Sequence, residues 1–264
     1  MSVNYVKLYK NLLEIEISNS CPKHRRGRPS KITFEKAFDG IQTIIHTGMP
    51  WRCLKCHDVA HITVFKTLHK WISVDAFSRS YTRLLKLYSL KRRPKHYAID
   101  STFIKNMYGR DSVGRNPTDR GRKATKMTVT VDDIGVPHAF LFSGANVSDF
   151  KLLDKTLDSA MVPLVRGTPL YADKGYDSKY NHALSSNKYG LCDRLFRRRS
   201  INTRRTHAKR GIVERFFAWN DKQRRLLVRY EQKIATYAAF MYVHSGLLLA
   251  KRLGSEKSMH GATR

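Results

Sequence analysis

The sequence predicts a mixed α/β domain that follows a helical N-terminal region. Apolar residues recur at helical spacing as far as a basic, proline-bearing segment, and beyond it the periodicity changes to short strands that come to alternate with helices. Such alternation is typical of a sheet with helices on its faces. We expect a helical region at residues 1–90, a linker at 91–96, a mixed α/β domain at 97–253 and a disordered tail at 254–264.

The N-terminal region carries the spacing of amphipathic helices. Phe34 and Ile41 fall on one face of the first clear helix, and Gly48 is expected to end it. Further helical patterns occupy residues 64–72 and 77–88.

The α/β domain begins with a strand at residues 97–104, which contains a single acid. Strands at 127–131 and 137–142 flank a turn at 132–135 and predict a hairpin. The remaining expected elements are a helix capped by Ser148 or Asp149 that runs through Leu157, a strand at 170–172, a helix at 179–186, a strand at 191–196, and long helices at about 207–230 and 233–252.

The charge balance predicts a polyanionic partner. Fifty Lys and Arg residues against twenty-one Asp and Glu leave a net charge of +29. Nucleic acid is favoured over an anionic membrane surface, because the basic residues are spread along the chain and form no single amphipathic helix. With no signal peptide, no long apolar run and only four cysteines, we expect an intracellular protein of the cytoplasm or nucleoid, or of the nucleus in a eukaryotic host, that does not enter a membrane.

Three acids stand at positions where a solvated surface acid is not expected. Asp100 lies inside the first strand, Asp173 directly follows an apolar strand, and Glu214 lies in a helix beside aromatic residues. Three converging carboxylates can hold two Mg²⁺ ions about 3.5–4 Å apart, with which phosphodiester bonds are cut and joined. The alternative is that these acids form structural ion pairs with the many basic side chains.

Five short motifs, in order along the chain, resemble those of the DDE transposases of bacterial insertion sequences. The resemblance covers about residues 31–230 and is far more specific than any one motif. The motifs are Thr47-Gly48-Met49-Pro50-Trp51-Arg52, Ile99-Asp100-Ser101-Thr102, Gly121-Arg122-Lys123-Ala124-Thr125-Lys126, Ala172-Asp173-Lys174-Gly175-Tyr176-Asp177, and Val213-Glu214-Arg215-Phe216-Phe217-Ala218-Trp219 with the following Arg224 to Tyr230.

The resemblance implies an RNase H-like catalytic domain at 97–253 and an end-binding role for the helical region at 1–90. It implies that Asp100, Asp173 and Glu214 bind two Mg²⁺ ions, with Mn²⁺ as a substitute, and catalyse cleavage at transposon ends and strand transfer. The partners would be the terminal inverted repeats and target DNA, bound by a homodimer or a larger assembly.

One departure from the family concerns the glutamate helix. Related sequences often carry a tyrosine and an arginine before the glutamate and a lysine seven residues after it; here His207, Arg210 and Asp221 hold those positions. If the helix continues, Arg210, Glu214, Asp221 and Arg225 share one face. The role of the missing lysine would then pass to Lys222 or Arg225.

Basic residues for DNA contact are expected in three further places. Arg26 and Arg28 belong to a Gly-Arg-Pro segment that resembles a minor-groove hook, and Arg197 and Arg198 to a basic run before the Glu214 helix. Lys123 and Lys126 lie in the Gly-rich basic turn. A solvated loop or linker is the alternative for the first two segments.

Several other signals are given structural interpretations. Asp132 and Asp133 are expected to be turn residues, Asp149 a helix cap, and Asp177 a helix cap or a group behind the acids. Zinc binding by Cys53, Cys56, His57 and His61 stays open, but free thiols are favoured, and haem attachment to the Cys-x-x-Cys-His segment would need export. Two alternatives to an active transposase remain: an inactive, transposase-derived DNA-binding protein and a non-transposing metal-dependent nuclease.

Overall fold

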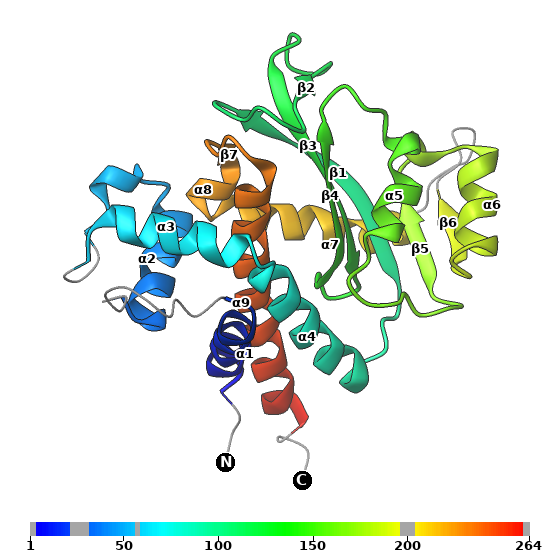
Figure 1. Cartoon of the computed structure of the whole chain (residues 1–264). Helices are drawn as coiled ribbons and strands as arrows, with labels where there is room; N and C mark the ends of the chain where they lie inside the picture. The colour runs from blue at the N-terminus through cyan, green and yellow to red at the C-terminus, as the bar shows by residue number, and fades with distance from the viewer. Residues whose placement is uncertain (1–3, 22–31, 56–58, 196–203, 261–264) are drawn as a thin grey trace. The chain divides into compact units, whose positions relative to one another are not determined.

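The chain divides into two compact units (Figure 1). The structure, a computed structural model, describes residues 4–21, 32–55, 59–195 and 204–260, without the side chains of 204–208 and 255–260. The helical unit comprises residues 1–88, 222–227 and 235–264, and the sheet unit comprises 89–221 and 228–234.

The helical unit contains the N-terminal helices and also the last helix of the chain. From the sequence, most of that helix is expected in the α/β domain at 97–253. The Tyr9 hydroxyl donates to the Tyr242 carbonyl at 3.2 Å, and a Cβ added to Gly246 would lie 2.2 Å from the Tyr9 ring. Only glycine permits this close approach. The elements are α1 (Tyr5–Ser20), α2 (Phe34–Thr47), η1 (Trp51–Cys53), α3 (His61–Ile72), α8 (Arg224–Leu227), and most of α4 (Ala76–Lys91) and α9 (Ile234–His260).

Helix α2 follows the sequence expectation closely. The Thr33 hydroxyl accepts a hydrogen bond from the Lys36 N–H at 3.3 Å, which caps the start of the helix. Gly48 ends it in the left-handed region, at φ 69°. Phe38 and Ile41 on its apolar face are fully buried.

The sheet unit contains, among the described residues, one seven-stranded mixed sheet. Strands β4, β3 and β1 form an antiparallel meander, and β5 and β6 continue the sheet parallel to β1. Short β2 and β7 extend the sheet by pairing with β3 and β1. The strands are β1 (Tyr97–Asn106), β2 (Gly114–Arg115), β3 (Lys123–Asp132), β4 (Pro137–Gly144), β5 (Pro169–Ala172), β6 (Cys192–Leu195) and β7 (Val228–Arg229).

Helices cover both faces of this sheet (Figure 1). On one face, Phe216 packs on Phe140 with ring centroids 6.2 Å apart. On the other face, Ile99 belongs to a buried cluster with Leu153 and Leu157. The helical segments are α7 (Arg204–Asp221) on the first face, and η2 (Asp149–Lys151), α5 (Leu153–Asp158), η3 (Lys174–Tyr176) and α6 (Lys179–Asn187) in the rest of the unit.

The prediction of one long helix at 207–230 is wrong for the second half of this range. Helix α7 ends at Asp221, and Val228 and Arg229 instead form a strand that pairs with the end of β1. The expected shared face of Arg210 and Arg225 therefore does not exist. The last helix also continues to His260, into the tail that was expected to be disordered.

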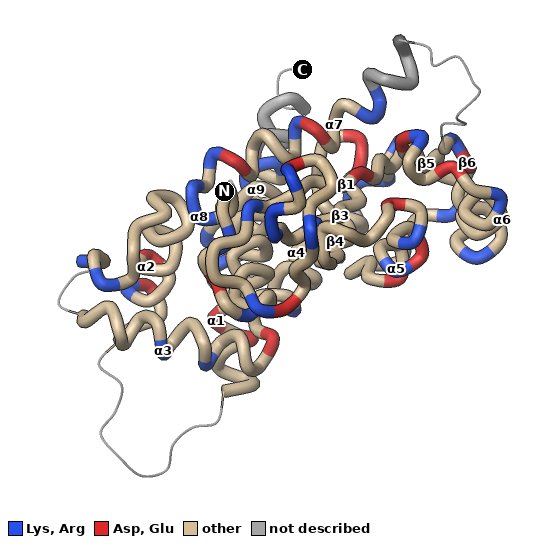
Figure 2. The backbone as a smooth tube through the Cα atoms, turned by 90° about the horizontal axis from the view of Figure 1, so that it is seen from above, with Lys and Arg blue, Asp and Glu red and all other residues tan. Residues whose placement is uncertain are grey.

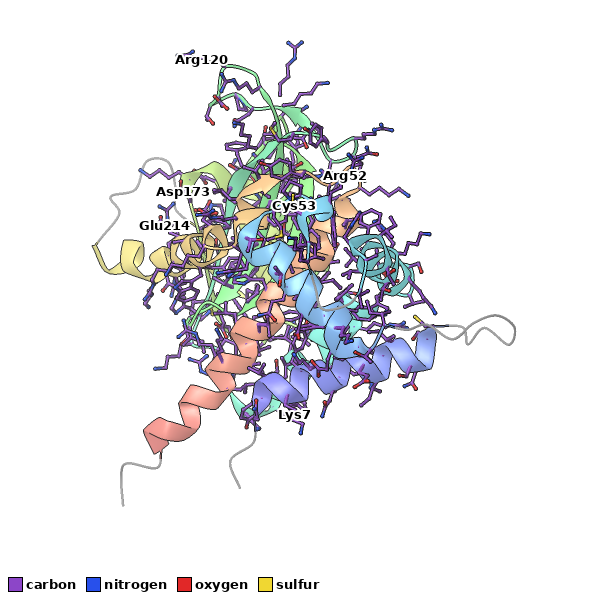
Figure 3. The ribbon with its side chains drawn as sticks, turned by 90° about the vertical axis from the view of Figure 1, so that its left-hand side faces the viewer. Lys7, Arg52, Cys53, Arg120, Asp173 and Glu214 are labelled. Carbon is purple, nitrogen blue, oxygen red and sulfur yellow. The ribbon has the colours of Figure 1, made fainter. Side chains whose placement is uncertain are left out.

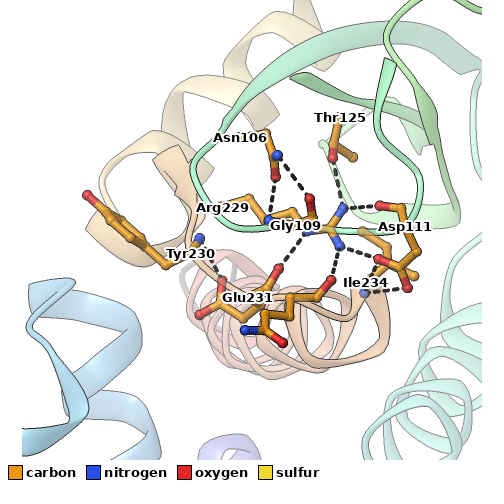
Figure 4. Close-up of polar contacts among 9 residues, drawn as sticks. Asn106, Gly109, Asp111, Thr125, Arg229, Tyr230, Glu231 and Ile234 are labelled. Carbon is orange, nitrogen blue, oxygen red and sulfur yellow. Dashed lines mark hydrogen bonds and ion pairs between the residues drawn. The ribbon is translucent and has the colours of Figure 1, made fainter. Parts of the chain in front are cut away.

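Arg229 fixes this strand through a fully buried guanidinium group (Figure 4). It donates to the Asp111 carbonyl at 2.6 Å, to Thr125 at 2.9 Å, and to the carbonyls of Glu231 and Gln232 at 3.0 Å each. A further hydrogen bond reaches the Asp111 carboxylate. Five hydrogen bonds satisfy the donors of a charge that would be costly to bury unpaired.

The acids of the hairpin are structural, as expected. Asp132 accepts the backbone N–H groups of Ile134 and Val136 at 3.0 and 2.9 Å, and Asp133 forms an ion pair with Arg92 at 2.6 Å. No helix among the described residues is long and apolar enough to cross a membrane.

A histidine between two aspartates joins α6 to β6. His182 Nε2 lies 3.0 Å from Asp177, and Nδ1 makes a short contact with Asp193. Ser178, rather than Asp177, caps α6 by accepting the Asn181 N–H. Partial burial lowers the pKa of His182, but its hydrogen bonds with the two aspartates outweigh this effect and raise the pKa above its usual value.

The raised pKa of His182 predicts a loss of stability as the solution becomes more alkaline. The folded state holds the proton more tightly than the unfolded state, so the stabilisation is complete below pH about 6.5 and is lost as pH rises through the folded pKa. We expect the Tm of the natural protein to fall over this range, and the fall to be smaller in His182→Gln. Equal pH dependence of Tm in the two proteins would contradict this role.

Arg229→Lys is expected to lower the free energy of unfolding by about 2 kcal/mol. A lysine keeps the charge but cannot supply the same fork of donors, which leaves buried acceptors unpaired. Denaturant unfolding measures the change, with Arg122→Lys as the exposed control, expected within about 0.5 kcal/mol of the natural protein. A similar small effect at both positions would show that the Arg229 hydrogen bonds contribute little.

Candidate active site

Asp100 lies in the middle of β1, opposite Val129 of β3. One of its oxygens accepts the Ser101 N–H at 2.8 Å. Burial raises the pKa of Asp100 to about 6, and the nearby carboxylates of Asp173 and Asp149 act in the same direction, against the Ser101 N–H and the Arg210 guanidinium. These charged groups therefore lie within electrostatic reach of one another.

Parallel pairing of β1 with β5 places Asp173 beside Asp100. Ala98 lies opposite Tyr171, so two residues further along each strand the chain reaches Asp100 and Asp173. Asp173 is the first residue after β5, where the carboxylate leaves the sheet. Its side chain is 48 % exposed.

Helix α7 adds the third acid together with a cation. Arg210 Nη1 lies 2.9 Å from an Asp173 oxygen, and Nη2 lies 3.3 Å from a Glu214 oxygen one helical turn away. Glu214 is 60 % exposed, whereas Arg210 is mostly covered. Figure 3 shows Asp173 and Glu214 side by side in the sheet unit.

The sheet unit thus gathers the three predicted acids around one arginine. In this arrangement Arg210 stands between Asp173 and Glu214, and within the described parts of the chain no three acidic, histidine or cysteine side chains are close enough to hold a metal ion. The donor set nevertheless fits Mg²⁺, because hard carboxylate oxygens are the ligands it prefers. Sharing an ion among the three acids requires the Arg210 side chain to turn aside.

Asp149 is a fourth acid at the site, and the expectation that it caps a helix is wrong. Its carboxylate accepts a hydrogen bond from Lys126 at 2.9 Å and lies against Gly175. The position of Asp149 after the last antiparallel strand of a basic chain could have indicated a residue near the site. A helix cap explains an acid at this position equally well.

Buried hydroxyl groups lie beneath the acids. Ser101 Oγ is 2.8 Å from the Thr128 hydroxyl and 2.9 Å from the Tyr176 hydroxyl. Burial and the nearby charges of Asp149 and Asp100 raise the pKa of Tyr176 well above its usual value. Tyr176 therefore stays a neutral hydrogen-bonding partner. It lay within a motif, but the sequence did not single it out.

Two residues predicted to contact DNA are instead buried. Lys126 is 5 % exposed and also donates to the Val147 carbonyl at 2.6 Å. Arg225 lies in α8, in the helical unit, where it is 7 % exposed and donates to the Gly48 carbonyl at 3.5 Å. Both side chains are turned into the protein, where they donate hydrogen bonds to internal acceptors.

Of the other predicted contacts, two are exposed, one lies at the acids and four lie outside the described residues. Lys123 and Lys222 are exposed, and Arg210 lies at the acids. Arg26, Arg28, Arg197 and Arg198 lie outside the described residues, as do Cys56 and His57 of the suggested zinc site, whereas Cys53 is an exposed free thiol.

The sequence matches a known family of proteins. The model of the transposase DDE domain family matches residues 91–249. The chain is 35 % identical over 155 residues to a putative transposase for insertion sequence element IS402 of Burkholderia cepacia, covering 56 % of this chain and 71 % of that protein.

The fold resembles a solved transposase. The cryo-EM structure of the piggyBac transposase synaptic complex with hairpin DNA superposes with a TM-score of 0.52 at 9 % identity, covering 97 % of this chain and 74 % of that chain. This likeness and the strand order confirm the predicted RNase H-like fold. By the family match and the insertion-sequence relative, the chain belongs to the DDE transposase family of insertion sequences.

Proposed function

We propose that this DNA transposase cuts the ends of its own element and joins them to target DNA at Asp100, Asp173 and Glu214. The observation that carries the proposal is the meeting of these acids, from β1, the end of β5 and α7, around Arg210. Backbone pairing of β1 with β5 holds the positions of Asp100 and Asp173, so the spacing of these two residues is set before any ligand arrives.

The three carboxylates would hold two Mg²⁺ ions, or Mn²⁺ in their place. Bound there, the ions would activate the attacking oxygen and stabilise the leaving oxygen. The protein supplies the rest. Arg210 would release Asp173 and Glu214 and, remaining on the same helix turn, offer its guanidinium to a phosphate next to the cut.

DNA is the partner that the charge supports. Lys and Arg lie on elements throughout both units (Figure 2), and the net charge is +29. We assign end recognition to the helical region at 1–90 and chemistry to the sheet. Because two element ends must be joined to one target, a homodimer or larger assembly on DNA is part of this proposal, and the reaction takes place where cellular DNA lies.

An inactive DNA-binding relative is the second candidate. Asp221, where the family often has lysine, favours it, because an acid cannot grip a phosphate. Asp221 is exposed at the last position of α7, beyond the acids. A nuclease that cuts without joining is the third candidate.

Asp173→Asn is expected to abolish both cleavage and joining while DNA binding persists. The amide removes the charge that a metal ligand needs, and the loss should exceed about 100-fold, since even groups behind a metal ligand contribute 10- to 100-fold. Labelled duplexes that carry the element's ends report binding, cutting and joining in one assay with Mg²⁺.

Asp158→Asn is the matched control, because Asp158 is an exposed acid on α5 that pairs with Lys188. Cutting without joining by the natural protein would identify a nuclease. Binding without either reaction would identify an inactive relative, and full activity in Asp173→Asn would refute the assigned site.

Metal binding is expected to stabilise the natural protein without DNA. A ligand that binds only the folded state raises Tm with concentration. We expect Mn²⁺ to raise Tm in the natural protein and in Asp158→Asn, and to have a much smaller effect in Asp100→Asn and Asp173→Asn. Equal shifts in all four proteins would place the metal elsewhere.

A further inference from the structure

The segment that joins β1 to β3 forms a basic tip at one end of the sheet unit, and Arg120 marks its extremity in Figure 3. From residue 105 to 123 it contains six basic residues, all exposed, and two acids, one of which is bound by the buried Arg229. The basic residues are Lys105, Arg110, Arg115, Arg120, Arg122 and Lys123.

Three of these cations surround a single hollow of about 410 Å³. No acid lines it. Among the described residues, none of the three cationic side chains takes part in an ion pair with an acid. The lining consists of Gly109, Arg110, Val113, Gly114, Arg115 and Lys123.

Strand pairing forces two of the cations together. Arg115 of β2 lies directly opposite Lys123 of β3 in an antiparallel pair, so both side chains leave the same face of the sheet. Like charges directly opposite each other are destabilising. An anion held between Arg115 and Lys123 would attract both side chains and so offset their mutual repulsion.

The third cation, Arg110, follows Gly109 in a loop that hydrogen bonds hold at Asn106, Gly109 and Asp111 (Figure 4). The Gly109 N–H donates to Asn106 at 2.9 Å, and the Asn106 amide donates back to the Gly109 carbonyl at 3.2 Å. The Arg110 N–H donates to the Gln232 carbonyl at 2.9 Å, and Arg229 holds the next residue. The loop backbone is thus fixed before any ligand binds.

The sheet register sets the distance from the hollow to the acids. Asp100 lies opposite Val129, and Lys123 is six residues before Val129 on the same strand. Six residues of strand span about 20 Å, and an even number of steps keeps Lys123 on the face of Asp100. B-form DNA covers this length in about six base pairs.

We propose that this hollow binds a backbone phosphate of the DNA about six base pairs from the phosphate that is cut. The inference rests on the proposed function, because it takes the cut phosphate to lie at Asp100. It adds a second, sequence-independent grip on the same duplex. Arg110 and Arg115, which no motif singled out, form this grip together with Lys123.

Arg115→Gln tests the hollow against Arg120→Gln, which removes the same charge from the tip outside it. The probes are end duplexes with twelve base pairs on both sides of the cut, or with only three on one side. We expect Arg115→Gln to bind the long duplex about 5- to 10-fold more weakly at 0.1 M salt, with a salt slope smaller by about one. Arg120→Gln should bind nearly as the natural protein does.

One of the two truncated duplexes should bind equally to the natural protein and Arg115→Gln, because it no longer reaches the hollow. Equal losses in Arg115→Gln and Arg120→Gln, no loss in either, or a loss that persists on both truncated duplexes would overturn the proposal. Thermal unfolding checks that both variants are folded.

Inorganic phosphate separates DNA from a free anion as the occupant. If phosphate at constant ionic strength raises the Tm of the natural protein but not of Arg115→Gln, while DNA binding is equal, the hollow is a small-anion site and the proposal fails. If the natural protein binds and cuts the end duplexes but Arg115→Gln binds them equally well, only this inference fails. If it does not cut, the proposed function fails.

Discussion

The parallel pairing of β1 with β5 is the constraint on which the site depends. It brings Asp100 and Asp173 to the same place in the sheet, although seventy-three positions of sequence separate them. Two carboxylates so close, one of them buried enough to raise its pKa to about 6, repel each other. Helix α7 places the positive charge of Arg210 beside Asp173. Because residues four apart share a helix face, Glu214 also lies beside Arg210.

Because basic side chains are in excess, several acids of the sheet unit form ion pairs with them. In the sheet unit, Asp111, Asp133 and Asp149 are each bound by a basic side chain that fixes a loop or a turn. Asp100 is different, since it accepts a hydrogen bond from the backbone N–H of Ser101 and its burial favours the protonated form. An acid kept in such a position, beside two others, supports the proposal that these residues bind a metal ion.

Local patterns and the family resemblance were enough to predict the strands of Asp100 and Asp173 and the helix of Glu214, because each depends on neighbouring residues. They failed for Val228 and Arg229, whose partners on β1 lie more than a hundred residues away. The run that contains them suits a helix as well as a strand. Likewise the neighbouring sequence does not distinguish the buried Lys126 from the exposed Lys123. Lys126 is buried because the chain after β4 brings Asp149 back to β3, where the two side chains form an ion pair.

The register of β1 and β3 also determines how DNA can be held. Asp100 lies on β1 and Lys123 of the hollow on β3, so backbone hydrogen bonds between these two long strands fix the separation of the two residues. Duplex DNA offers a phosphate every 3.4 Å or so along each strand, whatever its sequence. A fixed cationic hollow therefore adds affinity and orientation but cannot read bases. Recognition of the element's ends must then come from other surfaces, and the helical unit, which contributes none of the three acids, is free to provide it.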